Sequence, residues 1–375
     1  MDMKEISSRR EFLKTSAKFV GGLAALSEVG GINEIFAQNA PKPPSKSFEI
    51  RKIGDMKVSA VGLGCVDFAP VGYYGCKNEK SDIIKLVRRA FDNGITLFDT
   101  AEIYGMKTSE EWLAEALAPI KNQVKVETKF GFEVEENRPG ILNSKPEHIK
   151  KAVEGSLKRL QTDHIDMIFV HRIDQTVPIE EVAGTVSELM KEGKVLRWGL
   201  CEASAKTIRC AHAITPISAI QSEYAIWWRE PETKIFPTLE ELGIDFVAYS
   251  PLGRGYLTGV FDENSRFALP DRRAVLPRFT PQAMKHNAPL LDLVRKWAKL
   301  KGVTPAQFSL VWALSQRPYI VAIPGTTKIA HLDELCGAKG VRMSKEEIAK
   351  FDKEYAKIDI LGHRANEAIE AQIDK

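Results

Sequence analysis

Four polar residues stand at or just after the ends of short apolar segments: Asp99, Tyr104, Lys129 and His171. An acid, a phenol, an amine and an imidazole that meet at one site could protonate a carbonyl oxygen as hydride reaches its carbon. A tyrosine has a pKa of about 10 in water, and a neighbouring ammonium group lowers that pKa. We therefore expect Tyr104 to be the acid, Lys129 to lower its pKa, and Asp99 to orient the lysine. His171 would donate a hydrogen bond to the carbonyl oxygen or relay the proton.

Each of these residues also has a purely structural interpretation. Asp99 and Lys129 would form an ion pair at the rim of the fold, and Tyr104 would pack in its loop. His171 would be a hydrogen-bonded core histidine. One such residue alone favours the structural interpretation, whereas four at consecutive segment ends favour the catalytic one. A hydrolase that uses Asp99 and Glu102 as paired carboxylates is a weaker hypothesis, because no second strand supplies a matched acid.

Short apolar segments alternate with amphipathic ones along most of the chain. Helical periodicity is found at 82–93, 145–160, 179–191 and 234–242, and Gly243 follows the last stretch as a helix C-cap would. The predicted strands are 60–63, 96–99, 124–129, 165–171, 195–200, 219–222, 245–249 and 320–323. Strands alternating with helices predict a parallel α/β fold, and eight of them favour a single-domain (β/α)8 TIM barrel. The four polar residues would then meet at its C-terminal mouth, where such barrels place active sites.

Other segments refine this picture. Segments 48–53 and 56–59 flank Gly54-Asp55 and predict a small hairpin. The seventh connection contains a long loop at 253–288, which is typical of a functional lid. An open-sheet dinucleotide fold is not expected, because the GxGxxG pattern is incomplete after Gly64. Aromatic residues that could line a pocket, or simply pack at the rim, are Tyr73, Tyr74, Trp227, Trp228 and Phe279.

Composition narrows the class of protein. Apolar residues make up 44% of the 375 residues and charged ones 27%, which is ordinary for a globular protein. The net charge of +3, spread along the chain, does not predict a nucleic-acid partner. No apolar run is long enough for a membrane span. The five cysteines form no CxxC pair, so we expect free, mostly buried thiols and neither a disulfide framework nor a metal site.

The N-terminus is predicted to be an export signal. The run SRREFLK at 8–14 has the twin-arginine pattern, the apolar stretch 19–26 follows it, and Ala37 and Ala40 offer cleavage points. We therefore expect a signal at 1–40, a linker at 41–47 and the barrel at 48–375. Export by the twin-arginine (Tat) machinery to the periplasm follows from this interpretation. The alternative is an N-terminal amphipathic helix that happens to contain two arginines, in which case the protein would be cytoplasmic.

The chain resembles the aldo-keto reductase superfamily from about residue 48 to about residue 343. The run GITLFDTAEIYG at 94–105, followed by Ser109-Glu110, is similar to the family's signature. DMIFVHR at 166–172 resembles its fourth-strand motif, and AYSPLGRG at 248–255 its seventh-strand motif. IPGTTK at 323–328 resembles its loop for the cofactor phosphate. The resemblance implies an NADP(H)-dependent oxidoreductase that reduces a small aldehyde or ketone, with Tyr104 as proton donor.

The resemblance also implies a cofactor site. Cys201 and Glu202 stand where the family usually has a Ser-Asn or similar pair on the nicotinamide carboxamide. Gln221 matches the glutamine for the same group, and Tyr249 the aromatic that stacks on the ring. The residues implied at the pyrophosphate are Ser250, Leu252, Gly253, Arg254 and Gly255. Those implied at the 2′-phosphate and the adenine are Gly325, Thr326, Thr327, Lys328, His331 and Glu334.

Several positions depart from the family pattern. Cys201 replaces the usual serine, Glu202 the usual asparagine, His331 an arginine that packs on the adenine, and Leu335 an asparagine that contacts it. Cofactor affinity is therefore less firmly implied than the chemistry. The rival hypothesis is an NADP(H)-binding regulatory or redox-sensing barrel with little turnover. The sequence indicates neither the substrate nor the oligomeric state.

Overall fold

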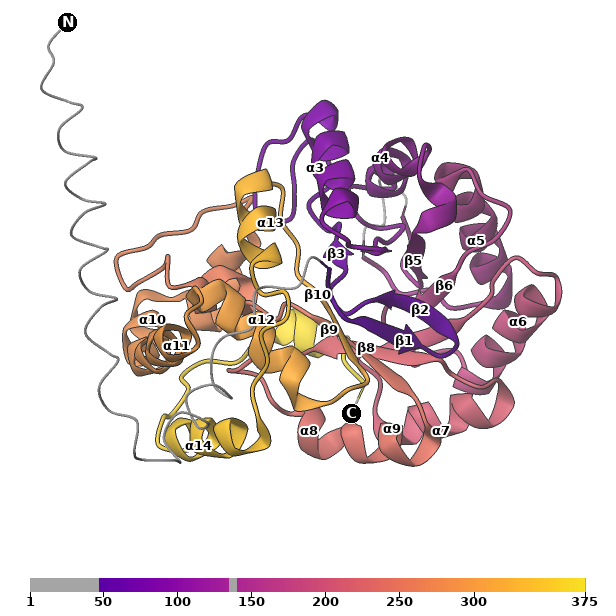
Figure 1. The fold of residues 1–375 in the computed structure, drawn as a ribbon. Helices are drawn as coiled ribbons and strands as arrows, with labels where there is room; N and C mark the ends of the chain where they lie inside the picture. Colours follow the sequence, from indigo (N-terminus) through magenta and orange to yellow (C-terminus); the bar gives the residue numbers. More distant parts are fainter. Residues whose placement is uncertain (1–46, 135–139, 375) are drawn as a thin grey trace, which may run out of the picture. The chain divides into compact units, whose positions relative to one another are not determined.

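The computed structural model describes residues 47–134 and 140–374. The predicted export signal at 1–40 lies outside the described residues, as does most of the predicted linker. The rest of the chain forms one barrel with strands at its centre and helices around it (Figure 1).

Eight parallel strands form the barrel wall and follow one another in chain order. They are β3 (Leu63–Gly64), β4 (Leu97–Asp99), β5 (Lys125–Phe130), β6 (Met167–Val170), β7 (Trp198–Cys201), β8 (Ala219–Glu223), β9 (Asp245–Tyr249) and β10 (Ile320–Ile323). Parallel bridges from Val61 to Ala322 and from Gly64 to Gly325 bring the first strand beside the last. The predicted (β/α)8 barrel is confirmed.

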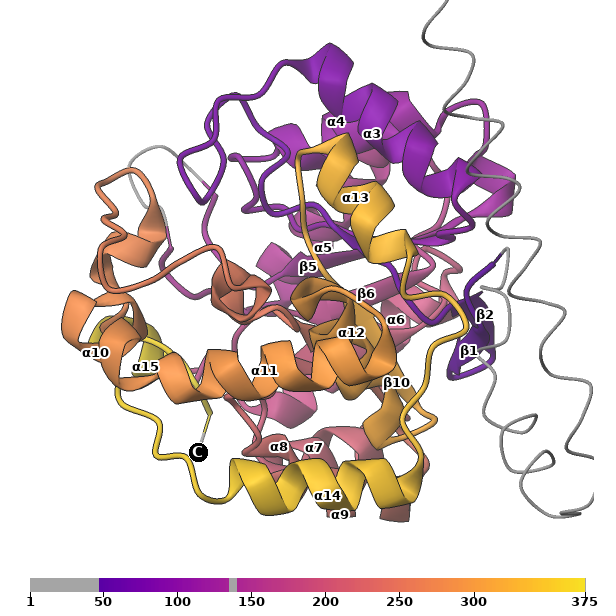
Figure 2. The same ribbon diagram turned by 60° about the vertical axis from the view of Figure 1, so that its left-hand side comes forward.

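Helices cover the outside of the strands (Figures 1 and 2). They are α3 (Lys80–Asp92), α4 (Thr108–Leu117), α5 (Pro146–Leu160), α6 (Ile179–Lys191), α7 (Ala205–Ile214), α8 (Pro231–Lys234), α9 (Phe236–Leu242), α12 (Pro305–Gln316) and α13 (Ile329–Cys336). The helix predicted at 234–242 corresponds to α9 and begins two residues later than predicted, since Lys234 is the last residue of α8. Gly243 ends α9 in the left-handed region at φ +68°, as predicted.

The predicted hairpin covers the N-terminal end of the barrel. β1 (Ile50–Ile53) and β2 (Met56–Ser59) pair antiparallel. Ile53 and Met56 pack against side chains of the barrel interior, including Phe169. Arg51 is buried and donates hydrogen bonds to the carbonyls of Leu314 and Ile320, beside the start of β10. The barrel is therefore closed at the end opposite to the predicted site.

The long seventh connection is ordered into short helices. They are η2 (Gly253–Thr258), η3 (Arg272–Val275), η4 (Pro277–Phe279), α10 (Pro281–His286) and α11 (Ala288–Lys301), and they precede α12. The remaining elements are η1 (Lys121–Gln123), α14 (Lys345–Tyr355) and α15 (Glu367–Glu370). Trp227 stacks on Tyr256 with 4.9 Å between ring centroids, and Phe279 packs edge-on against it. Trp227, Trp228 and Phe279 thus pack beneath this connection, in the core.

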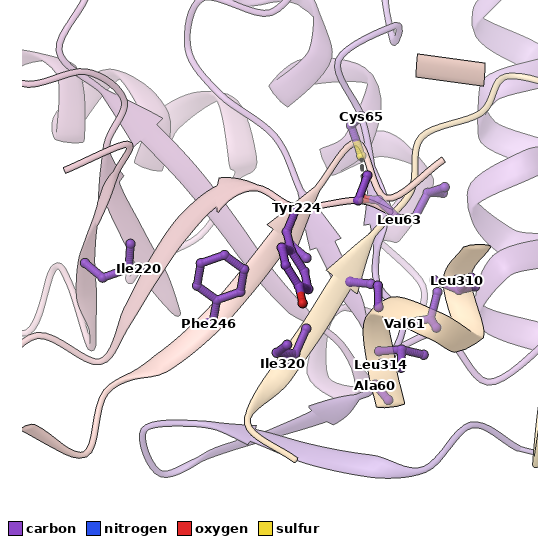
Figure 3. Close-up of a cluster of buried hydrophobic side chains, with 14 of the residues drawn as sticks. Ala60, Val61, Leu63, Cys65, Ile220, Tyr224, Phe246, Leu310, Leu314 and Ile320 are labelled. Carbon is purple, nitrogen blue, oxygen red and sulfur yellow. Dashed lines mark hydrogen bonds between the residues drawn. The ribbon is translucent and has the colours of Figure 1, made fainter. Parts of the chain in front are cut away.

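The main apolar core lies between the strands and the helices. Figure 3 shows part of it: Leu310 and Leu314 of α12 lie beside Val61 and Ala60. Of the five cysteines, all of them free thiols, three are buried. Within residues 47–134 and 140–374, no helix is long and apolar enough to cross a membrane. The same residues contain no cluster of three or more acidic, histidine or cysteine side chains that could hold a metal.

Candidate active site

A buried ion pair lies at the C-terminal mouth of the barrel. Asp99 is the last residue of β4, and Lys129 lies near the end of β5. The Lys129 Nζ lies 2.5 Å from Asp99 Oδ2 and 2.9 Å from the Thr100 carbonyl oxygen. Both side chains are almost fully buried, at 1% and 4% exposure, so the pair is shielded from solvent screening.

Tyr104 and His171 lie beside this pair. The Lys129 ammonium is 5.0 Å from the centroid of the Tyr104 ring. The His171 ring packs edge-on against Tyr104 with 5.6 Å between centroids, and Phe132 also packs edge-on against the imidazole, at 5.0 Å. The structure thus brings together the four residues that the sequence singled out.

The loop that carries Tyr104 is fixed at both flanks. Arg159 of α5 lies 3.2 Å from Glu102, before Tyr104, and 2.5 Å from Glu110, after it. Gly105 has φ +56°, and a Cβ there would lie 2.4 Å from the Ala69 Cβ, so this position needs glycine. Tyr104 therefore stands on a constrained loop. Glu102 is bound to Arg159 and does not line the main cavity, which weakens the paired-carboxylate hypothesis.

Burial controls the protonation of this group. Burial raises the pKa of Tyr104, and although Lys129 acts to lower it, the net pKa lies above 10. The sequence therefore predicted the effect of the lysine but the wrong net direction, because desolvation of the phenolate is stronger. Burial lowers the pKa of Lys129, but Asp99 together with the other acidic groups around it more than offsets this, so the net pKa is raised and the lysine stays charged. Burial, assisted by Arg172 and Lys129, holds the pKa of His171 well below its usual value, so the imidazole is neutral at neutral pH.

A cavity of about 630 Å³ opens at the mouth and reaches this group. Asp99, Tyr104 and His171 line this cavity, and so does Lys328 with its neighbours Thr326 and Thr327. The predicted cofactor residues that also line it are Gln221, Tyr249, Ser250, Leu252, Arg254, Gly255, Gly325, Thr326, Thr327, His331 and Glu334. Lys129, Cys201, Glu202 and Gly253 lie outside this lining. One space therefore joins the predicted catalytic residues to most of the predicted cofactor residues.

Comparison with known proteins decides the family. Residues 60–356 match the Aldo/keto reductase family. The chain belongs to the aldo/keto reductase family. In general terms, the chemistry of this family is NAD(P)-dependent carbonyl reduction.

Solved structures agree with this assignment. The chain is similar to the glycerol dehydrogenase AKR11B4 from Gluconobacter oxydans, with 30% identity, a TM-score of 0.75, and coverage of 82% of this chain and 95% of that one. The holo form of the aldo-keto reductase AKR11C1 from Bacillus halodurans has the same fold at 22% identity and a TM-score of 0.68, with coverage of 84% and 98%. So does an aldo/keto reductase from Klebsiella pneumoniae in complex with NADP and acetate, at 23% identity and a TM-score of 0.64, with coverage of 85% and 99%.

The departure from the aldo/keto reductase pattern at Glu202 has a structural counterpart. Both oxygens of Glu202 accept hydrogen bonds from Arg364, at 2.9 and 2.6 Å, and Oε1 also accepts one from the Glu223 backbone N–H. Burial opposes the charge of Glu202, but Arg364 outweighs it and lowers the pKa to about 2. Arg364 comes from the C-terminal tail and lines the cavity together with Ile369 and Ile373. The carboxylate therefore anchors the tail as one wall of this reductase's cavity.

Other cavity residues were missed by sequence reasoning. Arg172, Glu223 and Arg273 line the cavity, and the flagged Tyr73 and Tyr74 do so as well. Arg172 had a signal, since it directly follows His171 in the fourth-strand motif. The contribution of Arg364 had none, because 162 residues separate it from Glu202.

We expect Arg364→Met to lower the free energy of unfolding by about 3–5 kcal/mol at neutral pH, because it leaves the buried Glu202 carboxylate without its partner. A depressed carboxyl pKa stabilises the fold above the ordinary value of 4.5, and this stabilisation is lost as pH falls towards 2. The difference in unfolding free energy between the parent and Arg364→Met should therefore become smaller as pH falls from 4.5 to 2. Urea unfolding at several pH values measures it.

The control is Arg209→Met, which removes a largely exposed pair with Glu241 and should cost far less. Two results would contradict the assigned role of Glu202. One is an equal loss of unfolding free energy in the two variants, and the other is a difference between the parent and Arg364→Met that stays the same from pH 4.5 to 2.

Proposed function

We propose that this protein is an NADP(H)-dependent reductase of aldehydes or ketones, with Tyr104 as the proton donor. The observation that carries the proposal is the single cavity that reaches both Tyr104 and Lys328. When bound, the nicotinamide supplies the hydride. The chain's own residues bind and orient the substrate carbonyl, exclude water and supply a proton at the Tyr104 hydroxyl.

Four residues have separate parts in this reaction, and we call them the tetrad: Asp99, Tyr104, Lys129 and His171. The neutral His171 can donate a hydrogen bond to the carbonyl oxygen without competing for the proton. Lys129 lies 5.0 Å from the Tyr104 ring and stabilises the phenolate that forms when the proton leaves. Asp99, 2.5 Å from Lys129 Nζ, keeps the ammonium charged and in place. Burial keeps the phenol protonated until the developing alkoxide takes the proton.

The lining fits the cofactor at both of its charged groups. Arg254 lies on the cavity wall and pairs with Glu223 through Nη2 at 2.7 Å, while its buried Nε has no hydrogen-bond partner in the described chain. An unpartnered guanidinium N–H suits a pyrophosphate oxygen. Lys328 is exposed, lines the same cavity and stands directly before α13, where a cation suits a 2′-phosphate.

We expect Tyr104→Phe to lower the rate of carbonyl reduction by at least about 10²-fold, the lower end for loss of a general acid. NADPH binding should persist, because the hydroxyl alone is removed. Steady-state reduction of a panel of aldehydes and ketones, followed by NADPH oxidation, measures the rate. The matched control is Tyr319→Phe, whose hydroxyl bonds Glu240 and lies off the cavity. An unchanged rate would remove Tyr104 from the mechanism, and a parent protein that binds NADPH without turnover would support the sensing hypothesis.

We expect the parent protein to bind NADPH more tightly than NADH, and Lys328→Ala to abolish this preference. The loss in NADPH affinity should be about tenfold to a hundredfold, the size of one hydrogen bond to a charged group. Quenching of tryptophan fluorescence by each cofactor measures the affinities. Lys345→Ala, at an exposed position at the start of α14, is the control. Equal affinities in the parent would refute the assignment of Lys328.

Arg9 and Arg10 support a further proposal, that the folded chain is exported by the twin-arginine machinery. Folding in the cytosol would let the cofactor bind before transport and would bury thiols before they meet an oxidising compartment. Tight binding would also stabilise the folded form during transport.

We therefore expect the exported protein to contain nicotinamide cofactor and reduced thiols, and Arg9→Lys with Arg10→Lys to keep it inside. Cell fractionation, absorbance at the nicotinamide band and thiol counting measure these three outcomes. Normal export of the double-lysine variant would overturn the location. Exported protein without cofactor would leave the location standing and exclude a carried cofactor.

A further inference from the structure

A second carboxyl group lies beneath the Asp99–Lys129 pair and has not yet been given a role. Glu127 is on β5, two residues before Lys129, and its side chain is fully buried. In the barrel register it is the partner of Asp99 on one side and of Met167 on the other. Glu127 therefore sits where the polar mouth meets the apolar interior of the barrel.

The charges around Glu127 do not balance if it is ionised. Lys129 is the one ammonium at this level in the described residues, and it donates to Asp99 and to a backbone carbonyl, not to Glu127. The groups that face Glu127 are Asp99 of β4, Lys129 of its own strand, the Cys65 thiol after β3, and the Gln221 amide of β8. Two carboxylates would share one ammonium in a space closed to water, which is strongly unfavourable.

The hydrogen bonds of Glu127 are those of a neutral acid. Its Oε1 accepts a hydrogen bond from Gln221 Nε2 at 3.3 Å, whereas its Oε2 is buried and has no protein donor. A carboxylate would leave that oxygen unsatisfied. A protonated oxygen needs an acceptor instead, and the Asp99 carboxylate lies within hydrogen-bonding reach. Burial and the neighbouring Asp99 both raise the pKa of Glu127 well above its usual value.

We propose that Glu127 is a positioning residue of the reduction, held as a neutral carboxylic acid that donates a hydrogen bond to Asp99 and accepts one from Gln221. As a neutral group it leaves Asp99 as the sole counter-charge of Lys129. An ionised Glu127 would draw the ammonium down into the barrel, away from Tyr104. This inference rests on the proposed function, because the role concerns that reaction.

The same arrangement orients a cofactor residue. Gln221 donates through Nε2 to Asp99 at 2.9 Å and to Glu127 at 3.3 Å. Both N–H groups of this amide are thus directed at carboxyl groups, which leaves Oε1 as a free acceptor on the cavity wall. An acceptor oxygen suits the NH₂ of a nicotinamide carboxamide. Glu127 therefore links the Asp99–Lys129 pair to Gln221, the residue implied at the nicotinamide carboxamide.

Kinetics test the positioning role. Glu127→Leu should lower kcat by about tenfold, typical for loss of an outer-shell partner of a functional group, and should shift the pH dependence of kcat. Glu127→Gln keeps one donor and one acceptor, so it should recover most of kcat with the parent's pH profile. Met167→Leu, the register neighbour, controls for repacking of this layer. A shifted pH profile in Glu127→Gln, or the same kcat in Glu127→Leu as in the parent, would overturn the proposal.

Two measurements test the neutral acid without any turnover. A carboxyl pKa raised by folding favours the folded state at acid pH, and this advantage is lost as pH rises above 4.5. As pH rises above 4.5, the ratio of the folding equilibrium constant of Glu127→Gln to that of the parent should therefore increase by up to about tenfold per pH unit. If Glu127 is an ionised partner of Lys129, the variant instead loses stability as pH rises, and the proposal fails.

Infrared difference spectra of the parent minus Glu127→Gln give a direct readout. We expect a carbonyl stretch of a protonated carboxylic acid at neutral pH, absent from the variant. Its absence in the parent would overturn the proposal. The stability and infrared measurements need no substrate. If the parent protein reduces no carbonyl compound, the proposed function is refuted, but these two measurements still determine whether Glu127 is protonated.

Discussion

The buried ion pair between Lys129 and Asp99 is the interaction on which the site depends. A charge without a partner is very unfavourable inside a barrel, and even a matched pair gains from burial only when its geometry is fixed. Adjacent strands supply that fixed geometry, since Asp99 ends β4 and Lys129 lies on β5, which pairs with it. The pair in turn holds the Lys129 ammonium 5.0 Å from the centroid of the Tyr104 ring. The backbone pairing of β4 with β5 in the barrel wall thus fixes the position of the charged groups at its mouth.

The loops around this pair are held by the same physical means. Arg159 binds Glu102 and Glu110 on either side of Tyr104, and Arg364 binds Glu202 with 4% exposure on both side chains. Such pairs contribute less to net stability than their number suggests, because each loses its hydration. Their effect is to specify position: leaving either partner alone would be so unfavourable that the loop has one arrangement. These ion pairs thus hold the loop that carries Tyr104 and the C-terminal tail in place at the mouth.

Sequence alone predicted the barrel and the tetrad because both follow from local patterns. Strands buried on both faces are short apolar runs, and the ends of parallel strands converge, so Asp99, Lys129 and His171 could be placed together. The net pKa shift of Tyr104 could not be predicted, since the burial that dominates it is a property of the folded loop. The start of α9 at Phe236 had a local signal that was not used, which is Pro237 in the first turn. The Arg364–Glu202 pair had none, because nothing in either segment indicates the other.

The Arg364–Glu202 pair also accounts for a buried carboxylate at a position where the family resemblance implies an asparagine. Asparagine is neutral, and a free glutamate would bring a negative charge close to Cys201 and Tyr249. In this chain both oxygens of Glu202 are bound by the Arg364 guanidinium, so the two side chains together are neutral. The Glu223 backbone N–H, 2.8 Å from Oε1, fixes the carboxylate further. A glutamate paired in this way adds no net charge at this position. Its carboxylate holds Arg364 of the C-terminal tail, which lines the cavity, more strongly than a neutral asparagine would.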